Sequence, residues 1–133
     1  MYQALIEEIR GLRHNWISPE DVIMAIFYKI KNENIPKDHA IIQEAIFKLQ
    51  GSQKYQHILK EFTFDTSGLT PYSRLLEEVL TRLETFCILG TINPKYDTYQ
   101  VNREFLLRGF DRFPDEHKSV LCEISQEFET LLN

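Results

Sequence analysis

The sequence has few of the residues that crosslink small domains or bind metals. Two cysteines and four histidines are spread over 133 residues, and none of them forms a CxxC pair, an HExxH motif or another ligand spacing. Cys87 and Cys122 each lie in an apolar helical context, which favours buried free thiols over a disulfide or a zinc site. We therefore expect no metal, no cofactor and a reducing compartment, the cytoplasm.

Long apolar runs are also missing. No run approaches the roughly 20 residues that a membrane span needs, and residues 1–8 lack the basic-then-apolar layout of a signal peptide. Hydrophobic residues make up 43% of the chain and charged residues 26%, as in ordinary globular proteins. The composition predicts one folded domain over residues 1–133 that has no contact with a membrane.

Positive charge is scarce and evenly spread. Residues 1–61 carry 8 basic and 8 acidic side chains, residues 62–102 carry 3 and 5, and residues 103–133 carry 4 and 7. Phosphate contacts supply most of the non-specific affinity for DNA, so a DNA-binding protein needs several Lys or Arg on one face. The charge pattern disfavours a nucleic-acid partner without excluding it.

Catalytic patterns are absent as well. The five glycines stand alone and form no phosphate-binding loop, and adjacent carboxylates such as Glu77 and Glu78 point about 100° apart on a helix. Ser73 or Cys87 could serve as a nucleophile only if the fold brought a histidine to it. The histidines are scattered, and we expect surface or helix-end positions for them: His14, His39, His57 and His117. The sequence predicts a protein that is not an enzyme.

The first part of the chain, residues 1–60, reads as helical. An amphipathic pattern predicts a helix over residues 4–14. Ser18 followed by Pro19 predicts the cap and first position of a second helix that continues to Ile30. A third helix covers Ile41 to Leu49 and is expected to end at Gly51 in a left-handed cap. A short helical turn follows within residues 52–60, with Tyr55, Ile58 and Leu59 inward.

Residues 61–101 change character. Alternating phenylalanines predict a short strand over residues 62–65, and Thr70-Pro71 predicts the start of a long helix. That helix, 71–87, carries an apolar stripe of Tyr72, Leu75, Leu76, Val79, Leu80, Leu83 and Phe86. Its outer face is expected to hold Arg74, Glu77, Glu78, Thr81, Arg82, Glu84 and Thr85. Two β-prone runs around Asn93-Pro94 then predict a hairpin over residues 88–101.

The last part, residues 102–133, is predicted to hold two helices. Asn102 can cap the first, and Asp115 begins a terminal helix that runs to residue 132. The terminal helix has more apolar residues than a peripheral helix needs, so it either completes its own core or packs against a second copy. A homodimer is therefore an open possibility.

A helix that runs directly into a hairpin is the second half of a winged helix, whose helix reads the major groove. We therefore predict a mainly α fold with a short β-hairpin (α+β), in which a winged-helix-like core is flanked by N- and C-terminal helices. Residues 68–76 (GLTPYSRLL) and 83–90 (LETFCILG) also resemble the winged-helix-like Panacea (SocA-type) family. The resemblance covers about residues 61–101 and implies an adaptor or antitoxin-like role.

The sequence is compatible with two functions. The first is a non-enzymatic protein that binds another protein, whose identity the sequence does not reveal. The alternative is a DNA-binding transcriptional regulator that uses helix 71–87 and hairpin 88–101. The candidate interaction surface consists of Arg74, Arg82, Lys95, Tyr96 and Tyr99, although Tyr96 and Tyr99 have packing of the hairpin as an alternative role. Trp16 is a further interface candidate, or a staple before the Ser18 cap.

Overall fold

The fold is mainly helical, with one short antiparallel strand pair. The computed structural model describes residues 18–30, 35–86, 88–90 and 98–132. The helices are α2 (Pro19–Tyr28), α3 (His39–Gln50), α4 (Gln56–Leu59), α5 (Arg74–Thr85), α6 (Arg103–Asp111) and α7 (Asp115–Leu132), and the strands are β1 (Leu89–Gly90) and β2 (Gln100–Val101). The predicted fold class is confirmed.

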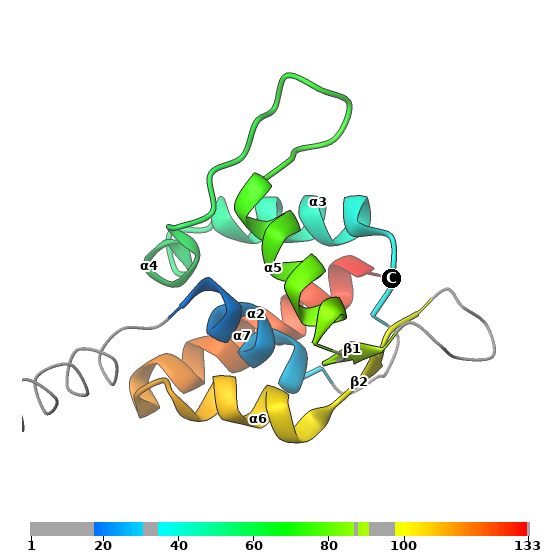
Figure 1. The fold of residues 1–133 in the computed structure, drawn as a ribbon. Coiled ribbons are helices and arrows are strands. Elements are labelled where there is room, and N and C mark those ends of the chain that lie inside the picture. The colour runs from blue at the N-terminus through cyan, green and yellow to red at the C-terminus, as the bar shows by residue number, and fades with distance from the viewer. Residues whose placement is uncertain (1–17, 31–34, 87, 91–97, 133) are drawn as a thin grey trace, which may run out of the picture.

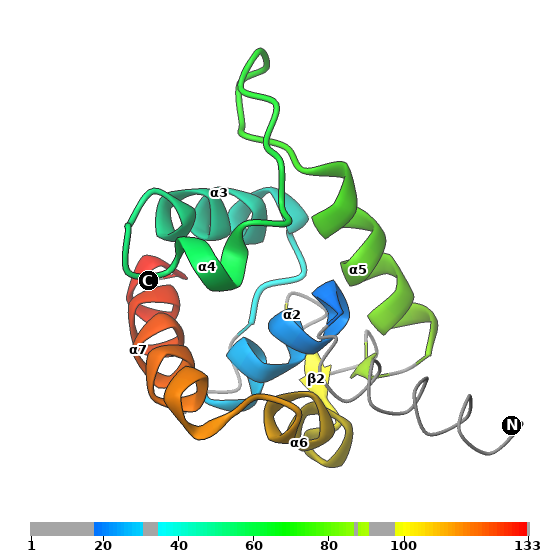
Figure 2. The ribbon, with the colours of Figure 1, turned by 90° about the vertical axis from the view of Figure 1, so that its left-hand side faces the viewer.

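Helix α2 is the central element. Its start is fixed by the predicted cap: Ser18 accepts a hydrogen bond from the Asp21 amide, and the Asp21 carboxylate accepts one from the Ser18 amide. Helices α3, α5, α6 and α7 surround α2 (Figure 2). Because α2 is covered on several sides, Ile23 and Ile26 are fully buried, within one apolar cluster that draws on all the helices. The helix ends at Tyr28, two residues earlier than predicted, while Ile30 stays buried.

The two strands form a short antiparallel pair. Leu89 pairs with Val101 and Gly90 with Gln100, so the predicted hairpin pairing is confirmed. A further antiparallel bridge joins Pro36 to Thr98. The Tyr99 amide donates to the Ile35 carbonyl at 2.7 Å, and the Asn102 amide donates to the Ile88 carbonyl at 2.9 Å. Successive residues of a strand direct their backbone groups to opposite edges of the strand. Residue 99 bonds to residue 35 and residue 102 bonds to residue 88, so segment 98–101 lies between residues 35–36 and β1 (Figure 1).

The connection between α3 and α5 is unusually long for this arrangement. A helix-turn-helix joins its two helices by a turn of about 3–4 residues, whereas here residues 51–73 intervene. They include α4, with Tyr55, Ile58 and Leu59 buried as predicted, and a loop that projects beyond the start of α5 (Figure 1). The strand expected at 62–65 is reduced to one bridge between Asp65 and Tyr72.

Two helix-end predictions were wrong. Gly51 has φ −66°, which is right-handed, so no left-handed cap forms there. Helix α5 begins at Arg74 instead of following Thr70-Pro71, because Tyr72 is held extended by its bridge to Asp65. Ser73 provides the cap, with its hydroxyl accepting from the Leu76 amide at 3.2 Å.

The C-terminal helices agree with the sequence prediction. Asn102 caps α6, and α7 begins at Asp115. The expected helix 4–14 and the hairpin turn lie outside the described residues. In the part of the chain that is described, each helix is too short or too polar to cross a membrane.

Candidate interaction site

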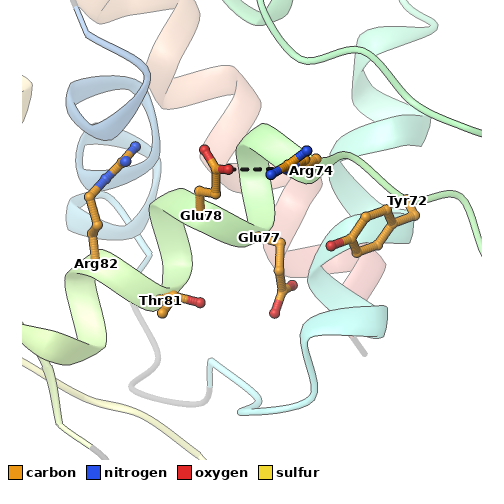
Figure 3. A pocket seen from close by; sticks show the side chains of 6 residues that line it. All are labelled: Tyr72, Arg74, Glu77, Glu78, Thr81 and Arg82. Atoms are coloured by element: carbon orange, nitrogen blue, oxygen red, sulfur yellow. Dashed lines mark ion pairs between the residues drawn. The ribbon is translucent and has the colours of Figure 1, made fainter.

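The outer face of α5 carries a shallow groove at the place where the sequence predicted a contact surface. Its volume is about 310 Å³. The lining residues are Tyr72, Arg74, Glu77, Glu78, Thr81 and Arg82 (Figure 3). The set contains two arginines and two glutamates, so its formal charges cancel.

Both arginines of the groove already have carboxylate partners. Arg74 Nε lies 3.3 Å from Glu78 Oε1, one turn along the same helix, and its side chain is 87% exposed. Arg82 forms an ion pair with Glu20 of α2. Pairing leaves these guanidinium groups less available to an incoming phosphate than a free cation would be.

The apolar stripe of α5 is shorter than predicted. Leu76, Val79, Leu80 and Leu83 are buried, whereas Tyr72 is 48% exposed and Phe86 71% exposed. Tyr72 precedes the helix, in the projecting loop, and Phe86 follows its last turn. Leu69, in the same loop, is fully exposed.

The other predicted surface residues differ in their outcomes. Tyr99 is only 1% exposed, so it is not a surface residue and its packing alternative is the one observed. The reason is that segment 98–101 lies between residues 35–36 and β1, and the Tyr99 side chain contacts His39 of α3 and Glu84 of α5. Lys95 and Tyr96 lie outside the described residues, as do Trp16, His14 and Cys87.

A polar cluster beneath the groove connects α3, α5 and the hairpin. His39, the first residue of α3, has Nδ1 2.7 Å from Glu77 Oε1. Its Nε2 lies 3.1 Å from Glu84 Oε1 and 2.6 Å from the Tyr99 hydroxyl. The Tyr99 hydroxyl in turn donates to Glu84. We call His39, Glu77, Glu84 and Tyr99 the His39 cluster.

The cluster perturbs its titratable groups. Burial lowers the pKa of His39, but hydrogen bonds to Glu77 and Glu84 and their negative charges outweigh burial and raise it above the ordinary 6.5. Burial, followed by the hydrogen bond to Glu84, raises the pKa of Tyr99 well above its ordinary 10.0. The cluster therefore favours the protonated form of His39 more than solvent does, and it keeps Tyr99 neutral at neutral pH.

A second polar contact holds the start of α5 against α3. The Gln43 side chain donates to the Ser73 carbonyl at 3.0 Å and accepts from the Ser73 amide at 2.8 Å. Gln43 is 2% exposed and Ser73 is fully buried. Ser73 therefore acts as a helix cap, inaccessible to the substrate that a nucleophile would need.

The remaining titratable or nucleophilic candidates are two neighbouring histidines and one cysteine. The rings of His57 and His117 lie 5.3 Å apart, and Cys122 is a half-buried free thiol. In the described residues, no group of three His, Cys, Asp or Glu side chains is placed to hold a metal ion.

Sequence reasoning missed the His39 cluster. Glu77 and Glu84 were assigned to the solvent face of α5, but they are 33% and 30% exposed and turn toward His39. A signal was present, because residues seven apart lie on one side of a helix two turns apart. Their common partner is 38 residues distant from Glu77 in sequence, and only the fold reveals it.

The fold is a mainly helical one in which α5 is followed directly by a two-stranded antiparallel hairpin, with α6 and α7 after it. No family model, curated protein or solved structure matches the chain.

Proposed function

We propose that the chain is a cytoplasmic, non-enzymatic adaptor or antitoxin-like regulator that binds another protein through the outer face of α5. The observation that carries this proposal is the balanced charge of the groove, in which Arg74 and Arg82 are both paired. Affinity for a polyanion comes from phosphate neutralisation, and in this groove each arginine is offset by a glutamate that would repel phosphate.

A protein partner fits the same face better. Protein interfaces are enriched in Tyr and Arg and combine apolar area with hydrogen-bonding groups. Tyr72 is half exposed beside the groove, and Leu69 adds exposed apolar area on the adjoining loop. The resemblance of residues 61–101 to the Panacea family supports the same class of function.

Site-specific photo-crosslinking in the source cells tests the proposal. A photoreactive residue replaces Thr81, which is exposed in the groove, and the matched control carries it at Gln126, exposed on α7. We expect one protein adduct of defined mass from position 81 and none from position 126. Equal adducts at both positions, or none at 81, would reject the α5 face as the binding surface.

The alternative function is a DNA-binding regulator, and one observation favours it. Helix α5 directly precedes the hairpin in the chain, which is the order of recognition helix and wing in a winged helix. In that role a homodimer would present two copies of α5 to two half-sites.

Fluorescence anisotropy with random-sequence duplex DNA at low salt tests the alternative. Binding that weakens in Arg74→Ala and Arg82→Ala, and persists in Arg108→Ala on α6, would support it. Light scattering on the same samples gives the mass of the particle with and without DNA. Absence of binding, or equal loss in all three variants, counts against recognition by α5.

A further inference from the structure

The His39 ring is surrounded by groups that accept hydrogen bonds. Glu77, next to Nδ1, is a carboxylate and has no hydrogen to donate. On the other side, Nε2 faces Glu84 and the Tyr99 hydroxyl. The hydroxyl has a single hydrogen, and in its contact with the Glu84 carboxylate the hydroxyl must be the donor, because a carboxylate only accepts. The Tyr99 oxygen therefore meets Nε2 as an acceptor.

Only the imidazolium form satisfies this arrangement. Both ring nitrogens must carry a hydrogen to donate, and neutral histidine has one N–H. If His39 loses the proton on Nε2, Tyr99 must turn its hydrogen away from Glu84 to reach the ring. If it loses the proton on Nδ1, Glu77 and the nitrogen become two acceptors 2.7 Å apart. Either way one carboxylate loses its donor.

We propose that His39 is a protonation-dependent latch: its imidazolium fastens α5 and the segment around Tyr99 to the start of α3, and loss of the proton releases Glu77 or Glu84. The latch joins three parts of the winged-helix-like core through one side chain that is 20% exposed. Protons from solvent can therefore reach it.

The charges around His39 make the latch depend on α5. A positive charge at the first residue of a helix is opposed by the positive end of the helix dipole. On its own segment, Lys37 and Asp38 precede His39, and the Asp38 carboxylate accepts from the Ala40 amide at 3.0 Å. The carboxylates that touch the ring both come from α5, so they supply the compensating negative charge.

Release would act on the outer face of α5. Glu77 is shared between the latch and the groove, so loss of the imidazolium removes a positive charge from beside the groove and frees the Glu77 carboxylate. The coupling between His39 and the groove follows from contacts within the fold, so it does not depend on whether α5 binds a protein or DNA.

Nuclear magnetic resonance of the full chain tests the latch without any substitution. The ring signals of the histidines are followed against pH, with His39→Gln used to assign the His39 signal. We expect His39 to titrate above 6.5, the ordinary value, and the amide shifts of Glu77 and Glu84 to move with the same midpoint. A His39 midpoint at or below 6.5, or α5 amides that do not follow it, would overturn the proposal.

A matched pair of variants isolates the contact from the general charge of α5. Glu77→Gln removes the carboxylate 2.7 Å from Nδ1, and Glu78→Gln removes the neighbouring carboxylate that pairs with Arg74. We expect a marked downward shift of the His39 midpoint in the first and a smaller one in the second. Equal shifts would show that no specific contact exists, and would also overturn the latch.

Discussion

The contact of α2 with α6 and the contact of α3 with α5 are built on different physics. In the first, Gly109 lies so close to α2 that an added Cβ would be 2.7 Å from Met24 Cβ and 3.2 Å from the Asp21 carbonyl oxygen. In the second, Gln43 binds the Ser73 backbone and His39 binds Glu77. The contact of α2 with α6 is held mainly by close packing, to which Arg112 adds an ion pair with Asp21 and Arg103 a hydrogen bond to the Tyr28 carbonyl. The contact of α3 with α5 depends instead on paired donors and on one proton.

The largest expected effect breaks the contact of α2 with α6. Leu106 of α6 is fully buried, and Leu106→Ala leaves a cavity that we expect to lower the free energy of unfolding by about 2–5 kcal/mol. Urea denaturation followed by circular dichroism measures it. Leu107→Ala is the control, because Leu107 on the same helix is 37% exposed; an equal loss in both variants would contradict this packing.

Gln43→Ala breaks the polar contact. It leaves the amide and carbonyl of Ser73 buried without their partner, at a cost of about 1–3 kcal/mol. Urea denaturation gives the total, and hydrogen exchange should show faster opening in the first turn of α5 than in α2. Gln126→Ala, on the exposed side of α7, should leave the free energy of unfolding and the hydrogen-exchange rates of α5 unchanged. Uniform acceleration across the chain would argue against a local anchor.

Gly109→Ala tests how closely α2 and α6 approach. The new Cβ must displace Met24 Cβ, and overpacking of this kind costs about 1–3 kcal/mol, part of which the helix propensity of alanine offsets. Thermal denaturation is the measurement. Gly68→Ala is the matched control, because the nearest atom to its Cβ is 3.9 Å away. A Gly109→Ala protein as stable as wild type would show that the helices can separate without cost.

The pH dependence of stability sharpens the comparison. The pKa of His39 is raised above 6.5 in the folded chain, so its contribution is fully present below about pH 6.5 and is lost as pH rises through the folded value. We expect the free energy of unfolding to fall as pH rises above about 6.5, and to fall less in His39→Gln. The measurements stop below pH 10. Burial and the hydrogen bond to Glu127 raise the pKa of Tyr55 from 10.0 to about 12 in the folded chain, so above pH 10 the ionisation of Tyr55 in the unfolded chain would also lower stability. Identical pH profiles for wild type and variant would show that His39 does not contribute to the pH dependence of stability.

The smallest effect belongs to the surface. Arg74 is 87% exposed and pairs with Glu78 within one helix, so Arg74→Ala should change stability by no more than about 0.5 kcal/mol. Urea denaturation checks this. A larger loss would mean that Arg74 supports the fold, and binding experiments with the variant would then no longer report on the groove alone.

Local patterns along the chain were sufficient for most helices and for the hairpin. The Ser18-Pro19 start, the Asn102 cap and α7 follow from caps, dipoles and periodicity, which act within a few residues. The start of α5 was misplaced because Tyr72 is held by Asp65, a contact across the loop. The projecting loop itself has no periodic pattern that predicts its path.

The features of the candidate site also fall into those that the sequence predicts and those that only the fold reveals. The sequence alone determined that α5 bears Arg74 and Arg82 on its outer face, because helical periodicity separates them from the buried leucines. Only the tertiary structure decided that Arg82 pairs with Glu20, that Tyr99 is buried and that His39 joins Glu77 and Glu84. Periodicity orders residues within one element, whereas these contacts join elements far apart in the chain and exist only once the helices have packed around α2.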